Sequence, residues 1–167
     1  MRNQFYKTQP MRGSHLPVLI KLMSITDGPV LEMGCGMYST PFLHWACYPS
    51  KRELVTIETK PEYFDFIEQF KTDYHKVWST DDVSLVDLSG KWSVAFVDHA
   101  PDNLRWLDIL RLSHAEYVVA HDADNATEGK YHYRRTHGEF LHRWKYSDAY
   151  PKTAVFSNFH DLKDFTV

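Results

Sequence analysis

The sequence predicts an α/β protein with a mostly parallel sheet and helices on both faces. Short apolar stretches, suited to buried strands, alternate along the chain with stretches whose apolar residues have helical spacing. The stretch 92–97 is apolar on both faces, as expected of a parallel strand under helices. Polar residues follow several of these stretches, and open parallel sheets bind ligands at that end of their strands.

In the N-terminal half, a first helix is predicted over 14–25, where apolar residues recur at helical spacing and Asp27-Gly28 ends the pattern. Helices are also expected over 40–47 and 61–74, each with a proline in its first turn, where proline is tolerated. The intervening apolar stretches predict strands at 29–33, 53–57 and 76–79.

In the C-terminal half, strands are predicted at 92–97 and 117–120, with an apolar helix over 103–112 between them. The stretch 130–143, rich in His, Tyr and Arg, is predicted to be a helix. The tail, 146–161, is expected to form two further strands around 148–152. This order favours a right-handed parallel sheet.

The composition fits one domain covering 1–167, in which 1–28 is a helical lead-in. The formal net charge of −3 weighs against a nucleic-acid partner. Two cysteines, Cys35 and Cys47, favour a reducing compartment over a disulfide-built fold. No signal-peptide pattern and no apolar run of the ~20 residues that a membrane span needs is present. We therefore expect a soluble, cytoplasmic protein with no membrane partner.

The end of the first strand carries the most specific motif, Glu32-Met33-Gly34-Cys35-Gly36. Two glycines let the backbone turn tightly and approach a ligand closely. The following helix start offers free N–H groups. The end of the second strand carries Glu58, some twenty residues later, where a carboxylate can accept hydrogen bonds from ribose hydroxyls.

These two motifs resemble those of class I S-adenosylmethionine (SAM)-dependent methyltransferases, whose Rossmann-like strand–helix order also matches the whole chain. The resemblance implies that Glu32, Gly34, Cys35 and Gly36 lie by the methionine part of SAM and that Glu58 binds the ribose. Many members have a third glycine where this chain has Tyr38, so Tyr38 could itself contact SAM. Asp81 or Asp82 falls where the family often contacts the adenine.

Acidic residues also follow the fourth and fifth strands, at Asp98 and at Asp122, Asp124 and Asn125. Oxygen ligands of this kind suit Mg²⁺ or Ca²⁺. The pattern is similar to metal-dependent O-methyltransferases of the catechol and caffeoyl-CoA type. That resemblance implies a divalent cation, Mg²⁺, held by Asp98, Asp124 and Asn125, with Asp122 as a competing ligand. The alternative is that these residues only form turns.

Those O-methyltransferases have a lysine base three residues after the first metal-binding aspartate, and this chain has Pro101 there. His99 is the nearest substitute, since a neutral imidazole can accept a proton. Asp98 and His99 are therefore the catalytic candidates, with a structural role for His99 as the alternative. The basic, aromatic segment 130–137 could bind an acidic or phosphorylated substrate or could be a solvated helix face.

The sequence thus predicts an enzyme, a SAM-dependent methyltransferase acting on a hydroxyl or amine of a small molecule. Three alternatives stay open. The chain could be a SAM-binding domain without catalysis, or a nucleic-acid methyltransferase, although the Asp98-His99-Ala100-Pro101 stretch lacks the doubled proline and aromatic typical of amino-methylating members. It could also bind another nucleotide such as NAD.

Overall fold

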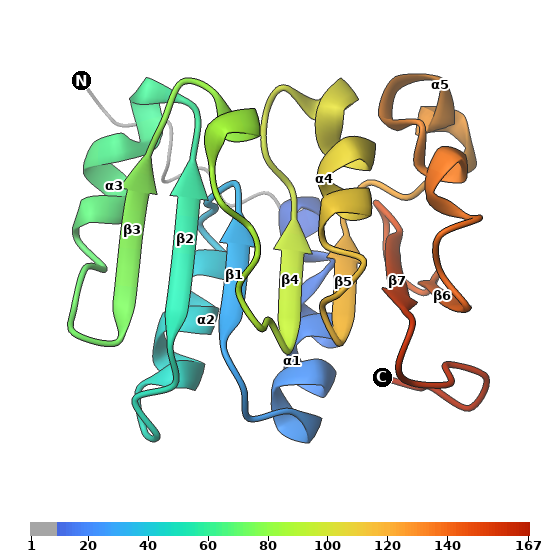
Figure 1. Cartoon of the computed structure of the whole chain (residues 1–167), viewed down its shortest axis with the longest axis horizontal. Coiled ribbons are helices and arrows are strands. Elements are labelled where there is room, and N and C mark those ends of the chain that lie inside the picture. Colours follow the sequence, from blue (N-terminus) through green and yellow to red (C-terminus); the bar gives the residue numbers. More distant parts are fainter. Residues whose placement is uncertain (1–9) are drawn as a thin grey trace.

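The computed structural model describes residues 10–167, which form one seven-stranded sheet flanked by helices (Figure 1). The strands are β1 (Val30–Met33), β2 (Leu54–Glu58), β3 (His75–Ser79), β4 (Val94–Val97), β5 (Tyr117–Ala120), β6 (His142–Tyr146) and β7 (Thr153–Ser157). Their spatial order is β3-β2-β1-β4-β5-β7-β6. The first five are parallel, and β7 pairs antiparallel with β5 and with β6. The predicted α/β class is confirmed, and the fold is that of class I methyltransferases.

Helices cover the sheet on both faces. The central strands β1, β4 and β5 are therefore buried along their whole length. Helices α1 (Leu16–Ile25) and α2 (Ser39–Cys47) pack into one hydrophobic cluster with one set of alternate strand residues. The other set packs with α4 (Arg105–Arg111) in a second cluster. The remaining helices are α3 (Phe64–Glu68) and α5 (Glu128–Tyr131).

The helix predicted over 61–74 is shorter than expected. A 3₁₀ turn at Pro61–Tyr63 leads into α3, which ends at Glu68. After Glu68 the chain turns toward β3, and just before that strand the Tyr74 carbonyl accepts the Leu54 N–H of β2 at 2.8 Å. Sheet pairing therefore overrides the helical pattern of the sequence.

The prediction of a helix over 130–143 is wrong. The α5 helix stops at Tyr131 because His132 adopts a left-handed conformation with φ 56°. Tyr131 and Tyr133 both point inward, with their rings stacked 5.5 Å apart. Residues two apart cannot share one face of an α-helix, so the packing of these two tyrosines is incompatible with a continuous helix.

The parallel strands all point the same way, so the loops after β1, β2, β4 and β5 meet at one edge of the sheet (Figure 1). The first and fourth strands are neighbours there, with Met33 beside Val97. Among residues 10–167, no helix is both long enough and apolar enough to cross a bilayer.

Candidate functional site

A cavity of about 690 Å³ lies at this edge, and we call it the strand-end cavity. Its volume is within the range of small-molecule and cofactor sites. The lining comes from the segment before α1, from the loops after β1, β2, β4 and β5 with the first residues of α2 and α4, and from the loop before β7. Residues of this lining include Arg12, His15, Gly34, Cys35, Gly36, Tyr38, Glu58, Lys60, Asp98, His99, Arg105, His121 and Asp122.

The two glycines of the turn after β1 line the cavity for different reasons. Gly34 has φ +89°, and a Cβ there would lie 2.6 Å from the carbonyl atoms of Asp98. Glycine at 34 is thus required for the β1 and β4 loops to pack together. At Gly36, a Cβ would meet only the Ser39 hydroxyl, at 3.4 Å. Packing within the protein does not require glycine at 36, and its bare backbone faces the cavity, where a ligand can approach closely.

Glu58 lies at the cavity wall with its carboxylate fixed by backbone donors. Its Oε2 accepts the Cys35 N–H at 2.8 Å, and its Oε1 accepts the Thr59 and Lys60 N–H groups, both at 2.7 Å. A carboxylate offers about four acceptor positions, of which these backbone donors take three, and the weakly donating Cys35 thiol is a further hydrogen-bond partner of Glu58. This oriented carboxylate can accept a hydrogen bond from a ligand hydroxyl.

Glu32 lies beneath the turn and is absent from the cavity lining. Its side chain is fully buried, and its Oε2 accepts the hydroxyls of Thr40 at 2.9 Å and Thr56 at 2.8 Å. The Thr40 hydroxyl in turn accepts the Gly36 N–H at 3.0 Å. Burial raises the pKa of Glu32 to about 7. In the structure Glu32 therefore shapes the glycine turn from below.

Other residues predicted to contact the cofactor divide into two groups. Cys35 and Tyr38 line the cavity, and burial with the nearby Glu58 carboxylate raises the pKa of the Cys35 thiol, which keeps it protonated. Asp81 and Asp82 are exposed and lie outside the lining. Asp82 instead caps the following 3₁₀ turn by accepting the Ser84 N–H at 2.9 Å.

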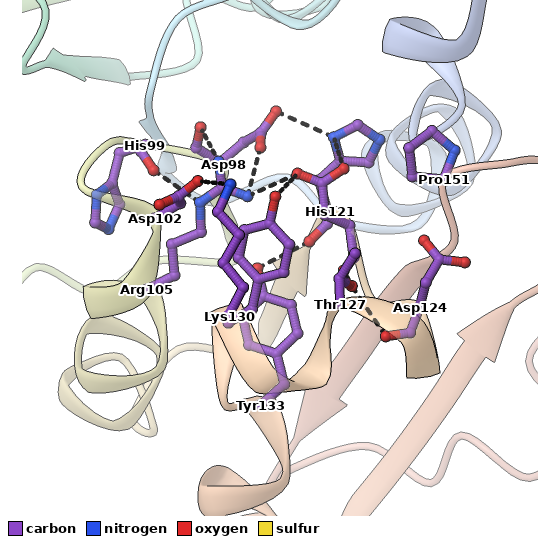
Figure 2. Close-up of polar contacts among 12 residues, drawn as sticks. Asp98, His99, Asp102, Arg105, His121, Asp124, Thr127, Lys130, Tyr133 and Pro151 are labelled. Carbon is purple, nitrogen blue, oxygen red and sulfur yellow. Dashed lines mark hydrogen bonds and ion pairs between the residues drawn. The ribbon is translucent and has the colours of Figure 1, made fainter.

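Arg105, at the start of α4, organises the acidic side of the cavity (Figure 2). Its guanidinium contacts Asp98 Oδ1 at 2.9 Å and Asp122 Oδ2 at 3.1 Å, and it donates to the His99 carbonyl at 2.7 Å. The ring of Tyr131 lies 4.9 Å away, and its hydroxyl donates to the same Asp122 oxygen at 3.0 Å. The loops after β4 and β5 are thereby held by one buried cation.

Asp98 is a carboxylate at the junction of this network. Burial acts to raise its pKa, but the charge of Arg105 and the hydrogen bond from His121 outweigh burial and lower the pKa to about 2. His121 Nδ1 lies 3.2 Å from Asp98 Oδ2, and its Nε2 lies 2.9 Å from the Ser14 hydroxyl. Burial opposes a charge on His121, but Asp98 and Asp122 raise its pKa above the ordinary value.

His15 is a site residue that the sequence did not reveal. Its ring is 2% exposed and packs 4.7 Å from both Phe96 and His121. Among residues 10–167, neither of its ring nitrogens has a hydrogen-bond partner. Burial, with the neighbouring His121, lowers its pKa to about 3, so the imidazole is neutral. No local motif marks His15 or Arg105, because each reaches the cavity only through the packing of its helix.

His99 borders the cavity but its ring is turned away from the Asp98 carboxylate (Figure 2). The residue is 1% exposed, and its Nε2 lies 2.9 Å from Asp108 Oδ2 on α4. Its Nδ1 lies 3.2 Å from the Ala100 carbonyl. The catalytic role of His99 therefore stays a prediction, while its contact with α4 is structural.

The magnesium ligands predicted from the sequence do not form one site. The Asp98 carboxylate contacts Arg105 and His121, whereas Asp124 and Asn125 are absent from the cavity lining. Asp124 accepts the Lys152 N–H at 3.1 Å, and in Figure 2 it lies on the far side of His121 from Asp98. Asn125 is exposed. This donor set does not fit a shared cation, because the turn after β5 directs Asp124 toward β7.

Comparison with solved structures finds the same fold in methyltransferases. Cofactor-bound Rv0187 from MTB is 18% identical over 93% of this chain and 83% of its own, with a TM-score of 0.63. N-methyltransferase NodS from Bradyrhizobium japonicum WM9, in complex with S-adenosyl-L-homocysteine (SAH), is 14% identical over 90% and 87%, with a TM-score of 0.60. SAH-bound methyltransferase PaMTH1 from Podospora anserina is 13% identical over 89% and 78%, also at 0.60.

Sequence comparison alone finds no relative: no family model matches, and no curated protein matches. At these identities the likeness to solved structures shows the fold, and the function must be argued from the cavity.

Proposed function

We propose that this chain binds SAM in the strand-end cavity and transfers its methyl group to a hydroxyl or amine of a small molecule. One observation carries the proposal: the uncovered backbone of Gly36 and the carboxylate of Glu58 line the same cavity, and the Cys35 N–H between them fixes that carboxylate. The fold of the SAH-bound structures NodS and PaMTH1 supports the same cofactor.

The residues of the cavity fit the two ends of this cofactor. The Gly34–Gly36 turn presents glycine backbone without side chains to the cavity, which lets the amino-acid part of SAM approach closely. The Glu58 carboxylate suits a ribose hydroxyl, because the Cys35 N–H already orients it and a hydroxyl is a stronger donor than the neighbouring Cys35 thiol. Bound SAM supplies an electrophilic methyl group on a sulfonium.

The acceptor is expected beside the Asp98 carboxylate, which the loop after β4 brings to the cavity. A pKa of about 2 keeps Asp98 ionised and makes it a weak general base. Its proposed role is to accept a hydrogen bond from the acceptor and orient it. Arg105 fixes this carboxylate through Oδ1 at 2.9 Å. The basic residues Arg12 and Lys60 also line the cavity, which suits an acidic or phosphorylated small molecule.

Isothermal titration calorimetry with SAM, SAH and NAD tests the cofactor. We expect SAM and SAH to bind and NAD not to bind. Glu58→Ala should weaken SAM binding by about 1–3 kcal/mol, the scale for losing a charged hydrogen-bond partner. Glu62→Ala is the control, because Glu62 is an exposed acid four residues away and outside the cavity. Folded protein that binds neither SAM nor SAH would sink the proposal.

Methyl transfer itself is tested by following SAH formation from SAM with panels of small hydroxyl and amine acceptors. Turnover with an acceptor, lowered in Asp98→Asn without loss of SAM binding, supports the proposed role of Asp98. SAM binding without turnover on any acceptor would instead favour a SAM-binding domain without catalysis.

A further inference from the structure

Three potential metal ligands from separate parts of the chain converge at the inner wall of the strand-end cavity. They are His15 at the start of α1, Asp98 after β4 and His121 after β5. One ligand atom from each can be chosen so that all three lie within 4.8 Å of one another. Two of the three side chains are almost completely buried, at 2% exposure for His15 and 5% for His121.

Hydrogen bonding fixes which nitrogen of His121 is available. The Ser14 hydroxyl has one proton, which it donates to the Pro151 carbonyl at 2.6 Å. It must therefore accept a hydrogen bond from His121 Nε2–H at 2.9 Å. His121 Nδ1 faces Asp98 Oδ2 at 3.2 Å, and a cation bound between these two atoms would replace the proton of that hydrogen bond. An outer partner that holds the second nitrogen of a histidine in this way is typical of metal-binding imidazoles.

His15 supplies an independent observation. A buried polar group normally has a partner, and leaving one without a partner costs about 1–3 kcal/mol. Both nitrogens of His15 lack a hydrogen-bond partner within residues 10–167, although the ring lines the cavity and lies edge-on to His121. Coordination of an ion beside His121 and Asp98 would satisfy one of them.

Asp98 can serve as the third ligand because its two oxygens have different partners. Arg105 contacts Oδ1 at 2.9 Å, which leaves Oδ2 directed at His121. Asp98 and Asp122 together carry two negative charges against the single positive charge of Arg105. The local charge balance therefore tolerates a divalent cation despite the nearby guanidinium.

We propose that His15, Asp98 and His121 form a binding site for a divalent transition-metal ion of the Zn²⁺ or Fe²⁺ type. Two imidazoles with one carboxylate suit these borderline ions and do not suit Mg²⁺, which prefers oxygen ligands. All three residues line the cavity, so the open coordination positions face the space where a substrate would bind. The site differs from the predicted Asp98–Asp124–Asn125 set and does not depend on SAM binding.

The test titrates EDTA-treated full-length protein with Zn²⁺, Co²⁺ and Mg²⁺ in the absence of SAM. We expect one Zn²⁺ or Co²⁺ per chain, a Co²⁺ absorption spectrum typical of nitrogen and oxygen ligands, and far weaker Mg²⁺ binding. His15→Phe keeps an aromatic ring of similar shape and breaks no hydrogen bond recorded within residues 10–167. It should weaken Zn²⁺ binding by more than the roughly 10- to 100-fold that follows loss of an outer partner.

His44→Phe is the control, because His44 is another buried histidine outside the cavity, although its ring, unlike that of His15, is hydrogen-bonded to Tyr74 and His75. It should leave Zn²⁺ affinity unchanged. Should His15→Phe fail to fold, proton NMR of the wild-type protein with Co²⁺ replaces it: two imidazole rings should show paramagnetic shifts. Absence of Zn²⁺ and Co²⁺ binding, or binding that His15→Phe leaves intact, would overturn the proposal and leave the proposed SAM site untouched.

Discussion

Gly34 and Gly36 sit two residues apart in the same turn, yet their surroundings predict opposite responses to substitution. Gly34→Ala places a Cβ 2.6 Å from the backbone of Asp98 in a residue with positive φ. We expect a loss of stability of roughly 1–3 kcal/mol, the cost of a strained backbone site. Gly36→Ala should be near neutral, since its Cβ meets only the Ser39 hydroxyl at 3.4 Å. Urea unfolding of both variants checks the contrast, which equal losses would contradict.

Glu32 should make stability depend on pH. Burial raises its pKa from 4.5 to about 7 in the folded protein. Between these values the folded state holds a proton that the unfolded chain has lost, so the contribution of Glu32 to stability falls as pH rises from about 4.5 to about 7.

Glu32→Gln removes this titration while keeping the shape of the side chain. Relative to wild type, we expect the variant to gain on the order of 1–3 kcal/mol between pH 4 and pH 8. His15 and His75, with pKa values lowered by burial to about 3 and 4, titrate in both proteins and largely cancel in the comparison. Unfolding free energies at the two pH values give the answer, and a pH-independent difference would contradict this assignment.

At the scale of elements, Arg105 joins α4 to the loops after β4 and β5 through Asp98, Asp122 and the His99 carbonyl. Arg105→Lys keeps the charge but cannot reproduce this set of planar donors. We expect a destabilisation of about 1–3 kcal/mol, as for lost hydrogen bonds to charged groups. Thermal unfolding measures it, with Arg134→Lys, an exposed arginine, as the control. Equal stability of the two variants would show that Arg105 does not hold the loops.

The sequence predicts strands better than helices here, for a physical reason. Each central strand is a short apolar run that is buried on both faces, and such a run leaves little ambiguity. Helix ends depend on partners elsewhere in the chain. Tyr74 joins the sheet edge through Leu54, and His132 turns left-handed so that Tyr131 and Tyr133 can both point inward.

At the scale of the molecule, motifs at strand ends could be placed from sequence because parallel topology gathers those ends at one edge. Gly34, Gly36, Glu58 and Asp98 indeed meet at one cavity. Burial could not be predicted, and it decides that Glu32 lies beneath the turn rather than in the cavity. Likewise His15 reaches the cavity only because α1 packs against β4, a long-range contact that no local pattern encodes.

The most direct test of the central claim, that SAM occupies the strand-end cavity, is SAH titration of Gly36→Ala by calorimetry. The added methyl group projects from a cavity-lining backbone with little protein around it, so we expect wild-type stability together with a clear loss of SAH affinity. Gly129→Ala, where a Cβ meets nothing within 4 Å and which lies outside the cavity, should bind SAH as wild type does. Unchanged SAH affinity in Gly36→Ala would contradict the account, because it would place the ligand away from the glycine turn.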